Sequence, residues 1–443
     1  MADRHSFFRC YLVGALVART GDDMAGPALL LAALTLTGSA AEASSLLAAV
    51  TVSAAIGGPV LGPLLDRSPR PGRLLAGALV LYATGTAVVV TGLGRAPGPV
   101  TLLVAGVTGL LGPALSGGWT AQLPRTVPVD RLPRAGALDA MTFSVAGLAG
   151  PALAGGAAEA LGAPTAVAVS AALIAAAAPA AWLLPPAAGP GPATRSGPTE
   201  PPRAAPPAGI VASGIGAIAG SRSLTRATLT SVCSCAAQGM MTACLPLLGE
   251  RAMGGAGFGA ALLSCAALSA LLANAALARR PHMVAPDTVL WTAPLLQAAA
   301  LALAATGGPV ALVVAVAVAG LAEGPQLTAL FAVRHREAPK GLRAQVFTTG
   351  TSLKITGFAV GGSRRRAPGG PVPARRPPGG GGYRGPRRTG PLRRAHRPRT
   401  GPHQQPRLES NRLSPHVRST SPCTPPTIRT SGCAARASTT SRT

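Results

Sequence analysis

Three charged residues occur within five consecutive positions inside an apolar stretch near the N-terminus. Arg19, Asp22 and Asp23 occur in the segment VARTGDDMAGP, and the two aspartates follow the arginine by three and four positions. Residues at these separations share a helix face, so either carboxylate can pair with Arg19. Charges inside a membrane are costly and mark functional sites. The spacing therefore predicts either a structural ion pair or a carboxylate that takes up and releases a proton.

A second carboxylate stands deep in an apolar segment. Glu323 precedes Gly324 and Pro325, and no basic residue lies near it in the sequence. Lys354, in the next apolar segment, is the expected partner. If the two do not pair, Glu323 is neutral when buried and can carry a proton; if they pair, they neutralise each other. Three uncharged polar residues also lie in predicted spans of this part of the chain and either bind a ligand or join helices: Gln238, Asn274 and Gln326.

A third charged group follows the second apolar segment. The stretch GPLLDRSPRPGR begins at Gly62 and holds Asp66, Arg67, Arg70 and Arg73. A carboxylate and three guanidinium groups in one tight turn can pair with one another and with helix ends, and so hold one conformation. The alternative is ordinary loop charge. Asp139, near the start of a later segment, is expected to pair with arginines of its neighbouring loop.

Other kinds of site are missing from the sequence. The seven Cys have no metal-ligand spacing, and the six His form no pair at helical spacing. There is no Gly-rich phosphate loop of the G-x-x-x-x-G-K-[ST] kind and no catalytic constellation. We therefore predict no metal, no cofactor and no enzymatic activity.

The composition places these groups in a lipid bilayer. Of the 443 residues, 48% are hydrophobic and 12% charged, against about 25% charged residues in a typical soluble domain. Several apolar blocks exceed the roughly 18 residues that a membrane span requires. The pattern predicts an all-α membrane protein with eleven spans, at 8–36, 44–65, 74–93, 99–120, 136–158, 162–184, 224–248, 256–278, 287–306, 309–333 and 343–362.

Basic residues in the loops predict the orientation. With a cytoplasmic N-terminus, eighteen Lys and Arg fall in inside segments and two, Arg95 and Arg251, in outside loops. This asymmetry obeys the positive-inside rule. We expect a multi-pass protein of the plasma membrane.

The chain repeats itself at long range. Gly112-Pro113 and Gly324-Pro325 each precede a basic loop and a helix of small residues. Repeated halves are typical of secondary transporters, whose substrate site lies between them. We predict an N-terminal six-helix bundle over 1–184, a Pro-rich cytoplasmic linker over 185–223 and a C-terminal bundle over 224–362. This second bundle lacks the twelfth helix that the repeat demands.

The composition changes abruptly at Ser363. Residues 363–443 hold eighteen Arg, one Glu and no Lys or Asp, and so carry most of the net charge of +26. We expect a disordered basic tail that translates a shifted reading frame of a GC-rich gene. The rival is a genuine arm for anionic lipid or nucleic acid, but an outside location and a single aromatic, Tyr383, argue against nucleic acid.

The loop signature resembles that of the major facilitator superfamily. Gly62, Asp66, Arg67 and Arg70 match it; Pro69 and Pro71 depart from it, and Arg73 can stand in for its last basic residue. The resemblance covers residues 1–362 and implies two six-helix halves, with the Asp66 loop locking the inside gate partly against the eleventh helix.

The branch of the superfamily is indicated by two shorter matches. The fifth predicted helix resembles the drug:proton antiporter motif at Gly150, Pro151, Gly155 and Gly156, with one extra residue between the pairs. The Arg-Thr-Gly-Asp run that begins at Arg19 resembles macrolide and siderophore exporters. The resemblance implies a monomer that exports a small amphipathic molecule against protons. The alternatives are an uptake permease, a membrane-anchored basic scaffold, and a frame-disrupted remnant without activity.

Overall fold

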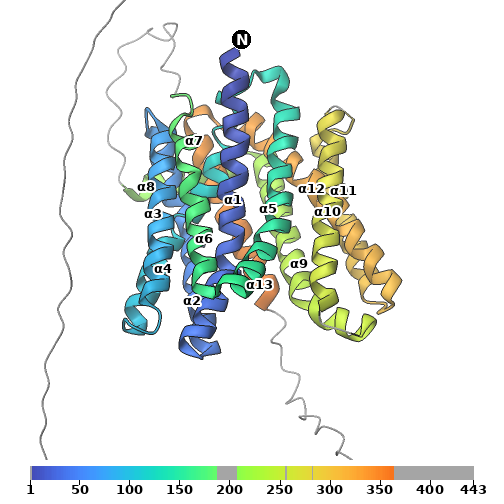
Figure 1. Cartoon of the computed structure of the whole chain (residues 1–443). Coiled ribbons are helices and arrows are strands. Elements are labelled where there is room, and N and C mark those ends of the chain that lie inside the picture. Colours follow the sequence, from blue (N-terminus) through green and yellow to red (C-terminus); the bar gives the residue numbers. More distant parts are fainter. Residues whose placement is uncertain (1, 187–206, 255–256, 282, 364–443) are drawn as a thin grey trace, which may run out of the picture. The chain divides into compact units, whose positions relative to one another are not determined.

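The computed structural model describes residues 2–186, 207–254, 257–281 and 283–363, and helices account for nearly all of these residues (Figure 1). No strand occurs in these ranges. The part before the linker forms α1 (Ala2–Thr37), α2 (Ala40–Arg67), α3 (Pro71–Gly92), α4 (Gly98–Gly109), α5 (Leu132–Leu161), α6 (Ala163–Ala176) and α7 (Ala178–Trp182). A π-helical turn, η1 (Ala114–Gly118), continues α4, and two 3-10 turns, η2 (Leu123–Arg125) and η3 (Val129–Arg131), lead into α5.

The part after the linker repeats this plan with one spanning segment fewer among the described residues. It comprises α9 (Arg222–Met253), α10 (Gly257–Arg279), α11 (Pro286–Ala304), α12 (Pro309–Glu337), the turn η5 (Lys340–Leu342) and α13 (Arg343–Ser363). Nine segments of the described chain are long and apolar enough to cross a membrane. The two other predicted spans, α1 and α13, form helices as expected but carry charged or hydroxyl side chains. The prediction of an all-α membrane fold is confirmed.

The linker contains a helix that the sequence did not predict. We expected 185–209 to be flexible or polyproline-like, and most of that stretch lies outside the described residues; within the remainder of the 185–223 linker, Pro207–Gly220 forms a helix, α8. Ile218 of α8 packs with Leu224, Ala338 and Val346 in a small core at the start of α13. This apolar burial, which depends on distant residues, explains why local Pro and Gly content was a poor guide. Residues 187–206 and the tail beyond Ser363 lie outside the described residues.

Small residues let the helices pack backbone to backbone. A β-carbon on Gly150 of α5 would overlap the backbone of α1 at Asp23 and Met24. A β-carbon on Gly361 of α13 would likewise overlap Ala236 of α9. Close approach of this kind is the usual basis of helix association in lipid.

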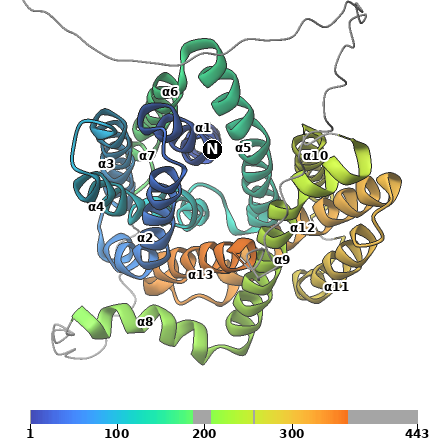
Figure 2. The same cartoon turned by 90° about the horizontal axis from the view of Figure 1, so that it is seen from below.

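The first and second sets of helices meet along α2 and α13 (Figure 2). The Ser352 hydroxyl accepts a hydrogen bond from the Gly58 amide at 3.0 Å and donates one to the Ala54 carbonyl at 2.7 Å. The Thr348 hydroxyl donates to the Gly58 carbonyl at 2.8 Å. These contacts lie in the half of each helix nearest to Asp66, so that end of the bundle is closed.

Candidate functional site

A deeply buried ion pair joins α1 and α5. Arg19 lies 2.8 Å from the Asp139 carboxylate, with side chains 3% and 0% exposed. Asp139 also accepts hydrogen bonds from Tyr11 at 2.8 Å and Thr120 at 3.0 Å. Arg19 donates to Thr120 at 2.9 Å and to Thr142. Both terminal nitrogens of Arg19 and both carboxylate oxygens of Asp139 thus have partners, although the Arg19 Nε atom has none among the described residues; hydrogen bonds of this kind offset the cost of burying an ion pair.

This arrangement corrects one expectation and decides between two others. Asp139 does not pair with loop arginines; it is fully buried and holds Arg19. Arg19 therefore does not form its ion pair with Asp22 or Asp23 on its own helix. Arg19 pairs with Asp139 because α5 brings this carboxylate and the Thr142 hydroxyl within reach, while Thr120, between η1 and η2, supplies a second hydroxyl group.

Asp22 has a different partner, which the sequence analysis missed. The Tyr82 hydroxyl of α3 donates to the Asp22 carboxylate at 2.9 Å. Asp23 has an exposed side chain, and its backbone packs against Gly150. No ion pair within 4.0 Å involves either aspartate in the described part of the chain. The two carboxylates thus differ in environment: Asp22 accepts a hydrogen bond from α3, and the Asp23 side chain is exposed.

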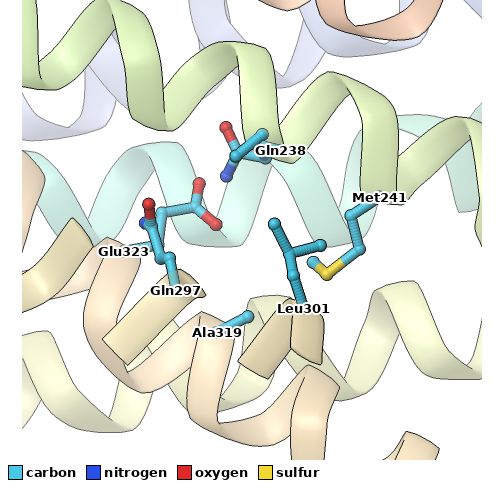
Figure 3. Close-up of a pocket in the computed structure, with 7 residues that line it drawn as sticks. Gln238, Met241, Gln297, Leu301, Ala319 and Glu323 are labelled. Atoms are coloured by element: carbon cyan, nitrogen blue, oxygen red, sulfur yellow. The ribbon is translucent and has the colours of Figure 1, made fainter. Parts of the chain in front are cut away.

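Glu323 occupies a polar hollow within the second set of helices. It is hydrogen-bonded by the Gln238 amide of α9, and Gln297, Met241 and Leu301 complete the wall (Figure 3). Lys354 lines an adjoining hollow that shares Glu323. The two hollows offer about 20 and about 30 Å³ to water, room for about two molecules each.

An amide network joins the hollow to its supporting helices. Gln297 donates to Gln326 at 3.1 Å, and Gln326 donates to the Ser234 hydroxyl at 2.8 Å. Thr328 donates to Asn274 at 2.9 Å. The structure thus brings Glu323, Lys354, Gln238 and Gln326 together, whereas Asn274 serves a separate helix contact.

Asp66 caps the N-terminus of α13. Its two carboxylate oxygens accept the backbone amides of Ala344 at 2.9 Å and Gln345 at 2.8 Å. A helix N-terminus carries partial positive charge and unpaired amides, so a carboxylate there stabilises the contact. The helices α2 and α13 are thereby tied at the end of the bundle that carries most of the basic loops.

A profile of the Major Facilitator Superfamily matches residues 11–362 of this chain. The chain belongs to the Major Facilitator Superfamily. The match ends at Gly362, one residue before the composition changes. No curated relative matches the chain.

Solved transporters of the superfamily share the fold. The human organic anion transporter TETRAN is 17% identical, with a TM-score of 0.64 over 81% of this chain and 92% of that one. A bacterial homologue of the iron transporter ferroportin in the outward-facing state is 14% identical, with a TM-score of 0.62 over 81% and 91%. The E. coli fucose:proton symporter FucP is 15% identical, with a TM-score of 0.60 over 81% and 89%.

The superfamily loop is only partly engaged in this conformation. Gly62 packs against Gln345, and Asp66 caps α13, but Arg67, Arg70 and Arg73 are exposed. Arg73 lies 4.8 Å over the Trp182 ring. The arginines near the Asp66 carboxylate are instead Arg125 and Arg343. Burial lowers the pKa of the Arg125 guanidinium, and the charge on Asp66 opposes that shift.

The fifth-helix motif is divided in the structure. Gly150 makes the close contact with α1, whereas a β-carbon on Gly155 or Gly156 would meet nothing within 4 Å among the described residues. Pro151 is exposed. The packing role of this motif therefore rests on Gly150.

Two further residues that the sequence analysis passed over are Tyr82 and Arg334. Tyr82 looked like one aromatic among apolar neighbours. Arg334 was counted as a loop charge, but it is 1% exposed in α12. The repeat offered a signal for Arg334: the equivalent position in the first half holds Gln122, another polar residue, which is 2% exposed.

Replacing Asp66 by asparagine is expected to loosen the start of α13. Loss of a capping carboxylate costs about 0.5–2 kcal/mol, which corresponds to about 2- to 30-fold faster local opening. Hydrogen–deuterium exchange of peptides covering 343–350 measures this opening. The control is Asp130→Asn, which removes an exposed carboxylate and should leave the exchange unchanged. Equal exchange in both variants would show that the cap does not hold the gate.

Proposed function

We propose that this chain is a secondary active transporter that exports a small amphipathic molecule in exchange for protons, by alternating access. The proposal is carried by the environment of Glu323. Its carboxylate lies in a membrane helix beside hollows with room for water, and no ion pair within 4.0 Å engages it in the described ranges. An unpaired carboxylate at this depth is stable when protonated, so gain and loss of a proton can be coupled to conformation.

Lys354 supplies the second state of the coupling. It lines the same hollow as Glu323, but no ion pair with a nitrogen–oxygen distance of 4.0 Å or less joins the two side chains. When Glu323 loses its proton, its charge is attracted to Lys354, and α12 and α13 are drawn together. When Glu323 is protonated, that attraction is absent. The proton thus changes the energy of a contact between the two helices nearest to the closed end.

Alternating access follows from how the two sets of helices touch. The contacts between α2 and α13 close one end, with Asp66 as the cap. The basic loops predict that this end is cytoplasmic. Export requires that this end open to admit the molecule and close before release outside. The wall of the hollow combines the amides Gln238 and Gln297 with Met241 and Leu301, so polar and apolar side chains meet there; in this conformation it has room for water only, and we propose that opening of the bundle enlarges it.

Asp22 and Asp23 are proposed as further protonatable groups. Arg19, on the same helix, forms its ion pair with Asp139 instead. The direction of transport rests on the fifth-helix motif, of which Gly150 makes a structural contact. The similar structure FucP is a fucose:proton symporter. This similarity supports proton coupling in this fold, but it favours uptake as the direction of transport. We propose export for this chain because its motifs resemble those of antiporters.

Substitution of Glu323 by glutamine is expected to abolish proton-coupled flux and leave the fold intact, because glutamine keeps the hydrogen bond to Gln238 but cannot ionise. Inverted vesicles with a panel of fluorescent amphipathic dyes and a pH-sensitive dye report both fluxes. Asp22→Asn is expected to weaken coupling in the same assay. Glu159→Gln, which changes an exposed carboxylate, is the control. Full coupling in Glu323→Gln would refute the assignment, and dye movement in the opposite direction would indicate uptake.

We further propose that residues 363–443 translate a shifted reading frame. The proposal is supported by the change of composition at Ser363 and by a family match that ends at Gly362. Sequencing the gene across codons of residues 350–375 tests it. A second frame that continues Gly362 with an apolar segment would support it. If no frame does, the tail belongs to the protein and the proposal fails.

A further inference from the structure

Arg334 is a buried cation to which the proposed transport mechanism assigns no role. Its side chain lies near the C-terminal end of α12 and is 1% exposed. The Nε atom and both terminal nitrogens lack a hydrogen-bond partner among the described residues. Arginine stays protonated in proteins, and an unpaired charge in a protein interior is strongly unfavourable. The attraction of a cation to a helix C-terminus offsets only part of that cost.

The neighbours of Arg334 leave its donors open. The guanidinium lies against Gly350 of α13, where a β-carbon would overlap it, and 5.7 Å over the Phe347 ring. The Thr349 hydroxyl beside Gly350 is also buried without a partner. The absence of a side chain at Gly350 thus leaves room for the guanidinium. The guanidinium of Arg334 and the hydroxyl of Thr349 both lack an acceptor among the described residues.

Arg334 lies one helical turn beyond Leu330, a residue that lines the hollow shared by Glu323 and Lys354, and does not itself line that hollow. Leu330, one turn earlier on α12, and Lys354, one turn after Gly350 on α13, both line that hollow. Cys235, which also lines it, is close enough to interact electrostatically with Arg334, Lys354 and Glu323. Lys354 and Glu323 line this space and Arg334 lies near its Cys235 wall, so the three charged groups together carry a formal charge of about +1, and more when Glu323 is protonated.

We infer that Arg334 binds an anionic group of the transported molecule: a carboxylate, sulfonate or phosphate monoester. The planar guanidinium presents paired donors that match such groups, and Ser231, Ser234 and Gln326 add polar atoms along the hollow. This inference rests on the proposed transport function and names its substrate class as amphipathic anions. Protonation of Glu323 raises the positive charge of the site, so proton and anion are expected to bind cooperatively.

Thermal unfolding of the full chain in a neutral detergent tests the inference. The probes are 1-naphthoate and its uncharged counterpart 1-naphthamide; inorganic phosphate and added phosphatidylglycerol form separate arms. We expect naphthoate to raise the unfolding midpoint and naphthamide to leave it unchanged, because ligands that bind the folded state stabilise it. A shift with phosphate alone would assign the site to a free inorganic anion, and one with phosphatidylglycerol alone to a lipid headgroup; either overturns the substrate assignment.

Two variants separate binding from structure. Arg334→Met is expected to raise the midpoint without ligand, because an unpaired buried charge is removed, and to lose the naphthoate shift. Arg336→Met is the control, since Arg336 is exposed and already paired with Asp287 and Glu337; it should keep the shift. If Arg334→Met lowers the midpoint and still responds to naphthoate, Arg334 is structural and the inference is wrong.

The same variants distinguish this inference from the transport proposal. If the wild-type chain moves dyes with protons but Arg334→Met moves anionic dyes equally well, transport stands and the anion site fails. If no flux occurs but the Arg334-dependent naphthoate shift remains, the anion site stands and the transport proposal fails.

Discussion

Asp139→Asn is expected to destabilise the folded chain by about 3–5 kcal/mol, because it leaves the Arg19 charge buried without its counter-charge. Asparagine has nearly the same shape, so the loss reports charge rather than packing. The contacts from Tyr11 and Thr120 also lose their charged acceptor. Titration with a denaturing detergent, followed by the fluorescence of the buried Trp119, measures the change.

Two controls make this result specific. Asp287→Asn removes an ion pair with Arg226 and Arg336 whose side chains are 41–64% exposed, and such pairs contribute about 1 kcal/mol or less. The double variant Arg19→Met with Asp139→Leu is expected to recover most of the lost stability, since apolar replacements of a buried pair are often neutral or stabilising. A double variant as unstable as Asp139→Asn would show that the geometry of the site, not its unpaired charge, sets the cost.

Gly58→Val is expected to prevent α2 and α13 from closing at the Asp66 end. A β-carbon at Gly58 would overlap the Thr348 carbonyl and the Ser352 hydroxyl, and valine also adds two methyl groups. Overpacking costs about 1–3 kcal/mol, which disfavours the closed state by about 5- to 150-fold. Proton-coupled dye flux should fall by a similar factor, and hydrogen–deuterium exchange over 345–352 should rise.

The matched control for this substitution is Gly77→Val on α3. A β-carbon at Gly77 meets nothing within 4 Å in the described structure, so the same change of residue there leaves the gate untouched. If Gly77→Val lowers flux as much as Gly58→Val does, the effect is one of helix stability and the gate assignment is wrong.

The location of the spanning segments could be predicted from the sequence, because uncharged apolar runs have few other stable environments. The pairing of the charges could not. Arg19 stands three and four residues from two carboxylates, yet its partner is Asp139, 120 positions away. Local spacing indicates which groups can meet on one helix. It does not indicate that other segments bring a carboxylate and two hydroxyl groups to the same guanidinium.

At the contact between α2 and α13, the sequence again identified some of the residues and missed others. Asp66 was identified by its motif, and its expected contact with the eleventh spanning helix is present as a cap on α13. The arginines of that motif were expected beside it, but Arg125 and Arg343 occupy that place, because the loops that carry them converge where α2 and α13 meet. Helix α8 was missed because its stability comes from packing on Leu224 and Val346, not from its own composition.

The sequence by itself determined that this chain is an α-helical membrane protein with repeated halves, since apolar length, loop charge and the repeat are properties of residue order. Only the tertiary structure decided which charges are paired and which are not. Arg19 has an ion-pair partner in Asp139, Glu323 lies beside the Gln238 amide and a hollow, and Arg334 has no hydrogen-bonding partner among the described residues. The physical reason is that a buried charge is governed by its few nearest atoms, and in a helix bundle most of these come from other helices.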